Sequence, residues 1–187
     1  MKKLTGLLAL LLAFTLTPAW AADEYSDATA KFREAPSAQS FFKNAYGYAI
    51  FPTIGKGAIG VGGAYGEGRV FKAGTYVGDV SMAQVSIGWQ LGGQTYSELI
   101  LFENKAAFDK FTEGNFGFDA QASAVAIAVG AGAQAGTEGA SANALDKQSK
   151  AAYVNGVAVF SMQKGGLMYE AALGGQKFTY HPKGEKK

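Results

Sequence analysis

The spacing of apolar residues changes once along this chain, from a helical repeat to a strand repeat, and the change falls near residue 46. Pro36 divides the helical part in two, because proline disfavours helix in the residue before it and removes a backbone donor. The sequence predicts an amphipathic helical hairpin or kinked helix that ends at Gly47. Residues at the helical spacing, all placed on one face, are Tyr25, Ala28, Thr29, Phe32, Ala38, Phe41, Phe42 and Ala45.

After residue 46 the chain alternates with period two, which is typical of strands. We expect a first strand at 46–51, stopped by Pro52, and a glycine-punctuated strand at 57–71. Residues 83–91 give the clearest half-buried pattern, because every odd position is apolar and the even positions carry Gln, Ser or Gly. The pair Gly92-Gly93 predicts a tight turn, after which residues 95–102 return as the partner strand of a hairpin.

The second half of the chain adds one helix and more strands. Asn104 can cap a short helix, Lys105–Thr112, which Gly114 ends. Residues 120–132 carry a small residue at every even position, which favours a buried strand closely approached by another layer over a membrane helix. Further strands are expected at 152–163, 166–173 and 178–180. The predicted fold is a single α+β domain, residues 22–180, of mainly antiparallel strands in a barrel-like or sandwich arrangement.

The N-terminus has the features of a signal peptide. A basic head, Lys2 and Lys3, precedes an uncharged apolar run at 4–16, and Ala19 and Ala21 are the small residues that a signal peptidase accepts. We expect cleavage after Ala21, export to the periplasm and a charged tail at 181–187; an uncleaved anchor is the alternative. Without the two leader lysines, the 17 basic residues become 15 and balance the 15 acidic ones. A neutral mature chain does not suit nucleic acid as a partner.

The residues that usually carry chemistry are scarce. The chain has no cysteine, and its one histidine, His181, sits beside proline in a Lys-rich tail, where we expect it to be solvated. No cluster has metal-ligand spacing, so we expect no metal, no cofactor and no enzymatic activity. The G-x-G-x-x-G pattern at 55–60 has no helix after it, which argues against a phosphate loop. Glu98 interrupts an apolar strand, and an outward-facing position is favoured over a half-buried one; a hydrolase using Glu98 or Asp119 is a distant alternative.

The helical segment at 25–45 is the part best suited to a membrane surface. Its aromatic rings can enter the headgroup layer while its basic residues meet anionic lipid. The alternative is that the same rings pack onto the sheet. The predicted lipid-binding residues are Lys31, Phe32, Arg33, Phe41, Phe42 and Lys43, together with Lys56.

Several segments in order resemble the SYLF-domain family of lipid-binding proteins. They are AYGYAIFP at 45–52, GGAYGEG at 62–68, GWQLGGQ at 88–94, LILFEN at 99–104 and KGGL at 164–167. The resemblance extends from about residue 26 to residue 180 and implies a compact β-rich domain with flanking helices that binds phospholipid. Eukaryotic members are linked to phosphoinositides and actin. Exported bacterial members resemble envelope proteins with general phospholipid affinity, and a neutral, exported chain argues against phosphoinositide and actin as partners here.

The leading prediction is a non-enzymatic phospholipid-binding protein of the bacterial envelope, peripheral to an anionic membrane. The alternative is a small outer-membrane β-barrel, which suits the export, the strand alternation and the 13 Phe and 9 Tyr. The helix at 105–112 and a C-terminus without an aromatic residue argue against it. The pattern leaves open the oligomeric state, the preferred lipid and whether the glycines admit another strand or a ligand.

Overall fold

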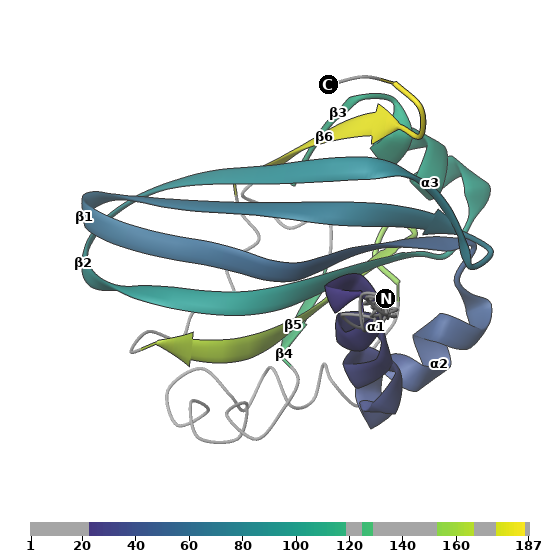
Figure 1. Cartoon of the computed structure of the whole chain (residues 1–187), viewed down its shortest axis with the longest axis horizontal. Coiled ribbons are helices and arrows are strands. Elements are labelled where there is room, and N and C mark those ends of the chain that lie inside the picture. Colours follow the sequence, from purple (N-terminus) through teal and green to yellow (C-terminus); the bar gives the residue numbers. More distant parts are fainter. Residues whose placement is uncertain (1–22, 119–124, 129–152, 167–174, 186–187) are drawn as a thin grey trace, which may run out of the picture.

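The computed structural model describes residues 23–118, 125–128, 153–166 and 175–185. In this part, three helices and six strands form an α+β domain, which confirms the predicted class (Figure 1). The elements are α1 (Glu24–Glu34), α2 (Pro36–Asn44), β1 (Gly47–Lys72), β2 (Thr75–Phe102), α3 (Lys105–Thr112), β3 (Asn115–Gly117), β4 (Val125–Ala128), β5 (Val157–Gly166) and β6 (Gln176–Pro182).

The first residues of the three helices are set by capping side chains and by a proline. Asp23 caps α1 by accepting from the backbone N–H of Tyr25 at 3.4 Å, and Pro36 occupies the first turn of α2, where its missing N–H has no cost. Asn104 caps α3 through the N–H of Ala107 at 3.0 Å. The two-part helical segment and the helix at 105–112 are therefore confirmed.

Strands β1 and β2 form one long antiparallel hairpin, with partners from Gly47 and Phe102 to Lys72 and Thr75. The connecting turn is Ala73-Gly74, where both residues have positive φ, 47° and 79°. The predicted turn at Gly92-Gly93 is wrong, because both glycines pair with β1 inside the continuous strand β2. The predicted strand end at Pro52 is also wrong: a register irregularity between Phe51 and Ile54 lets β1 continue past the proline.

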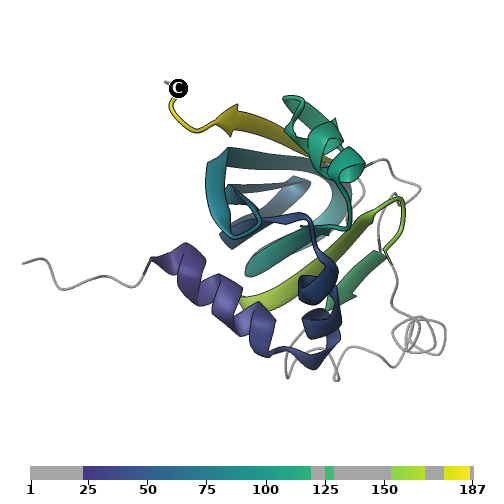
Figure 2. The same cartoon turned by 90° about the vertical axis from the view of Figure 1, so that its right-hand side faces the viewer.

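The hairpin folds back on itself, so that the two halves of β1 lie against each other (Figure 2). A Cβ built on Gly66 would lie 2.6 Å from Cγ1 of Ile54, and one on Gly68 would lie 2.7 Å from the Phe51 ring. Real Cβ atoms do not approach this closely, so only glycine fits at both positions. At these two sites the glycines admit another part of the same strand rather than a ligand.

The strand order is β3-β6-β2-β5-β4, with β1 also paired to β2. All of these pairings are antiparallel except β4 with β5. Strand β6 pairs with the first half of β2 and β5 with the second half. The strands expected at 152–163 and 178–180 correspond to β5 and β6. Of the strand expected at 120–132, the structure describes β4 and confirms that part; residues 167–173 of the strand expected at 166–173 lie outside the described residues.

Two apolar clusters hold the fold together. The inner one lies between the halves of the folded hairpin and under α3, and includes Phe51, Phe102, Phe111 and Phe178. The outer one joins the apolar faces of α1 and α2 to the other face of the sheet. No helix in the described part of the chain is both long and apolar enough to cross a bilayer.

Candidate functional site

Two of the predicted lipid-binding rings lie in the outer apolar cluster. Phe32 has no exposed surface, and Phe41 packs edge-on against Tyr153 and Phe160 at centroid distances of 5.0 and 5.2 Å. The hydroxyl of Tyr153 donates to the Phe41 carbonyl at 2.9 Å and holds this end of α2 in place. For these two rings the structure shows the alternative reading, packing onto the sheet.

The remaining predicted residues of the two helices keep some exposed surface. Lys31, Arg33 and Lys43 are exposed and Phe42 is half-buried, with the Arg33 guanidinium 4.3 Å above the Phe42 ring. This contact joins α1 to α2, and the Phe42 ring also packs against the outer apolar cluster. We call Lys31, Arg33, Phe42 and Lys43 the helical patch. The seventh predicted residue, Lys56, is buried in β1 and lies apart from them.

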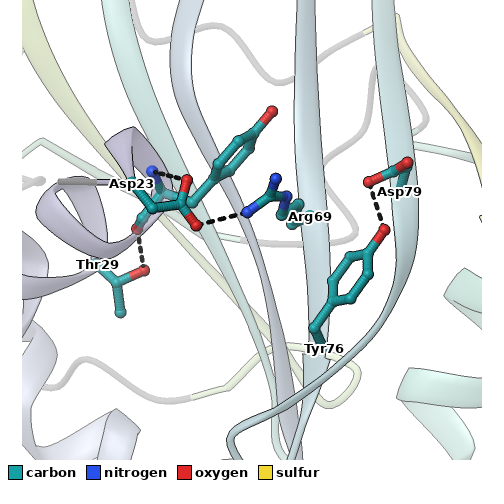
Figure 3. A network of polar contacts seen from close by, with 6 residues as sticks. Asp23, Thr29, Arg69, Tyr76 and Asp79 are labelled. Carbon is teal, nitrogen blue, oxygen red and sulfur yellow. Dashed lines mark hydrogen bonds and ion pairs between the residues drawn. The ribbon is translucent and has the colours of Figure 1, made fainter. Parts of the chain in front are cut away.

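A polar pocket of about 300 Å³ lies where α1 meets the sheet, and Figure 3 shows the contacts beside it. Arg69 of β1 forms an ion pair with Asp23 at 2.5 Å, and its guanidinium lies 4.1 Å from the Tyr25 ring centroid. The hydroxyl of Tyr76 donates to Asp79 at 2.8 Å. Because Arg69 is already paired and Glu67 and Asp79 also line the pocket, the charges do not favour an anion.

His181 belongs to this pocket and not to the tail. It lies in β6 opposite Asp79 of β2, so the sheet register brings the single histidine beside a carboxylate 102 positions earlier. Sequence reasoning missed this because nothing local predicted β6 to extend past Tyr180. Asp119, the other carboxylate considered for hydrolysis, lies outside the described residues. The described residues contain no group of three or more His, Asp or Glu side chains that could hold a metal ion.

A second polar cluster is buried inside the folded hairpin. Glu98 is only 1% exposed and its Oε2 accepts from Nε2 of Gln176 at 3.0 Å, so the expected outward position is wrong. Burial raises the pKa of Glu98 to about 7, although the Gln176 hydrogen bond opposes part of that rise. Burial also raises the pKa of Tyr96, two residues earlier on the same face. The buried polar layer comprises Lys56, Gln84, Gln94, Glu98 and Gln176.

Three acceptors of this layer have no hydrogen-bond partner within the described structure: Oε1 of Gln94, of Glu98 and of Gln176. An unsatisfied buried polar group costs about 1–3 kcal/mol. A proton on Glu98 would satisfy one of these atoms, since a carboxylic acid donates where a carboxylate cannot. The layer therefore favours the neutral acid at the expense of the charged form.

At residues 83–85 the faces of β2 are inverted relative to the predicted pattern. Gln84 points inward and is 5% exposed, while Val85 is 72% exposed. The apolar odd-numbered face was expected to be the buried one, and for Ala83 and Val85 that expectation is wrong. The physical reason is the buried polar layer, in which Gln84 lies opposite Gln176 of β6.

The sequence of the chain is similar to those of known proteins. Residues 83–186, more than half of the chain, match the family model of Ysc84, described as "Las17-binding protein actin regulator". Beta cell expansion factor A of Aeromonas veronii is 30% identical over 150 residues, which cover 79% of this chain and 50% of that protein. The chain thus spans about half the length of this relative. On the match to the family model, the chain belongs to the Ysc84, or SYLF-domain, family.

Proposed function

We propose that this protein is a non-enzymatic phospholipid-binding protein of the bacterial envelope, which associates peripherally with anionic membrane lipid. Membership of the SYLF family is consistent with lipid binding. The observation that carries the proposal is the helical patch, in which Lys31, Arg33 and Lys43 are exposed and the Arg33 guanidinium lies over the half-buried ring of Phe42. Basic residues together with an apolar aromatic ring are the usual composition of a membrane-surface contact.

The expected binding is weak and depends on salt. Each basic residue close to an anionic surface contributes about 1 kcal/mol, and the attraction falls off within a Debye length. Asp27 and Glu34 are also exposed on α1 and reduce the net positive charge of this face. Phe32 and Phe41 are buried in the outer cluster. The attraction to the membrane therefore depends on the basic side chains and on Phe42.

The test is flotation of the processed protein with vesicles of phosphatidylcholine alone or with added phosphatidylglycerol, at low and moderate salt. Flotation with the anionic vesicles only, weakened by salt, supports the proposal. Lys43→Glu should reduce it, whereas Lys110→Glu is the matched control, because both are exposed lysines in the last turn of a short helix. No flotation under any condition, or equal effects of the two variants, would contradict it.

The proposed location follows from the leader expected at 1–21. Release of the protein by osmotic shock would support a periplasmic, peripheral protein. Retention in the outer membrane after a carbonate wash would contradict it and favour an integral protein. The actin regulation in the family model's description is not part of the proposal, because the proposed location outside the cytoplasm would keep the protein away from actin.

A further inference from the structure

About halfway along their length, β1 and β2 bend together at one end of the molecule, and this region is unusually poor in charge. We define the hairpin end as residues 55–65 and 83–95. Lys56, which is buried, is the single charged residue in these two segments, and β2 carries no charge from Val80 to Ser97. In Figure 1 the bends of β1 and β2 lie on the side of the molecule away from α2 and α3.

Among the described side chains of this end, several polar ones point inward and two large apolar ones point outward. The inward face carries Lys56, Gln84 and Gln94, while the outward face carries Tyr65 and Val85, which are 56% and 72% exposed. Within the described part of the chain, these two are the exposed large hydrophobic residues, and both belong to this end. Among the residues of the hairpin end whose burial the structure describes, the exposed positions are Gly55, Gly57, Gly63, Tyr65, Ala83, Val85, Gly93 and Thr95.

Two exposed lysines flank this uncharged surface. Lys164 of β5 donates from Nζ to Oγ1 of Thr53 at 2.9 Å, just before the hairpin end in β1. Lys177 of β6 lies opposite Ala83 in the register. An uncharged surface with lysines at its border matches the depth profile of a bilayer, where apolar side chains meet the acyl region and lysines extend to the phosphates. The border also includes the exposed Glu67, which accepts a hydrogen bond from the Tyr65 hydroxyl at 3.1 Å.

We propose that the hairpin end is a lipid-contacting surface, which enters the outer acyl region of a phospholipid bilayer through Val85 and Tyr65. Lys164 and Lys177 then meet the headgroup phosphates. This inference rests on the proposed function and adds to it an apolar contact that is separate from the helical patch. A tyrosine suits this depth, since its ring is apolar and its hydroxyl is polar.

Single-site fluorescence tests this arrangement directly. The chain has no cysteine, so Val85→Cys and Thr75→Cys each provide a unique site for an environment-sensitive fluorophore, the first near the bend of the hairpin and the second beside its turn. Both positions are exposed. With phosphatidylglycerol vesicles we expect a blue shift and protection from an aqueous quencher at position 85, and neither change at position 75.

A pair of charge variants completes the test. Val85→Glu should reduce the fraction of protein that floats by roughly tenfold, because a carboxylate strongly disfavours the acyl region. Thr75→Glu should leave it unchanged, and thermal unfolding should be the same for both variants. If the wild type floats but the probe at 85 does not shift, the hairpin end is not the contact and the proposed function still stands.

If the wild type does not float at all, the proposed function fails first. A concentration-dependent blue shift without vesicles, accompanied by dimers in light scattering, would overturn the inference in another way. It would mean that a second copy of the chain covers Val85.

Discussion

The guanidinium of Arg69 donates to the carboxylate of Asp23 at 2.5 Å, joining residues 46 positions apart (Figure 3). Asp23 is also the N-terminal cap of α1, and the same guanidinium lies over the ring of Tyr25 in the first helical turn. One arginine of β1 thus holds the beginning of α1 against the sheet.

Replacing Arg69 with alanine should loosen the first turn of α1 without unfolding the domain. Both members of the ion pair are partly exposed, so the pair contributes at most about 1 kcal/mol. We expect faster amide hydrogen exchange in residues 24–28 and unchanged exchange in β2. The control is Arg33→Ala, which removes a guanidinium from α1 itself and should not speed exchange in residues 24–28. Equal exchange in the two variants would contradict the role of Arg69.

Glu98 should make the protein less stable as the pH rises. Its pKa is about 7 in the folded state against an ordinary value of 4.5, so the folded state binds the extra proton between these values. The free energy of unfolding therefore falls from pH 4.5 to pH 7, by up to about 3 kcal/mol from this group, and then levels off. Urea denaturation across this range measures the slope.

Glu98→Gln should abolish most of that slope and raise stability above pH 7. The variant amide keeps an acceptor for Gln176 and adds donors for the unpartnered oxygens of the buried polar layer. Glu103→Gln, an exposed carboxyl on the segment after β2, is the control and should leave the slope intact. A Glu98→Gln protein with the wild-type slope would show that another group is responsible.

Gly68→Ala should destabilise the protein by roughly 1–3 kcal/mol, because the added methyl overpacks a close contact. Its Cβ would lie 2.7 Å from the Phe51 ring and 2.8 Å from the Ile50 carbonyl oxygen. Gly57→Ala is the matched control in the same strand, since nothing lies within 4 Å of its added Cβ. Equal unfolding midpoints for the two variants would mean that the halves of β1 do not touch as described.

The turn offers a prediction of the opposite sign. Ala73 has φ of 47°, a conformation that asparagine adopts more readily than alanine, and it precedes Gly74 in a two-residue hairpin turn. Ala73→Asn should stabilise the hairpin by about 0.5–1 kcal/mol. Gly74→Asn gives the comparison, and we expect thermal unfolding to rank the first variant above wild type and the second below it.

The sequence correctly predicted the helices, because their formation depends on residues that are close together along the chain. Asn104, Pro36 and the apolar spacing of the helices act within a few residues, and the three helices agree with them. The turn was misplaced because Gly92-Gly93 is a stronger local signal than Ala73-Gly74, although only the second joins the strands. Glycine permits both a turn and a bend within a strand, and the pairing partner decides between them.

The inward position of Glu98 could have been predicted only by treating 75–102 as one strand. Met82, Gln84, Gln94, Tyr96, Glu98 and Phe102 all share even numbering, and all are buried. A turn assumed at residues 92–93 breaks this parity and frees Glu98 to point outward. Its partner Gln176 lies 78 positions later, beyond the reach of any local pattern.

The central position of the Ala73-Gly74 turn has a consequence for the order of folding. Every β1–β2 pair flanks this turn, so each new pair closes only a slightly longer loop than the one before it. The hairpin can zip outward from Lys72 and Thr75 at little entropic cost per step. Two later steps are the packing of Gly68 against Phe51 and the pairing of β5 and β6 with β2. Both join less local parts of the chain, so we expect them to be slower than the zipping of the hairpin.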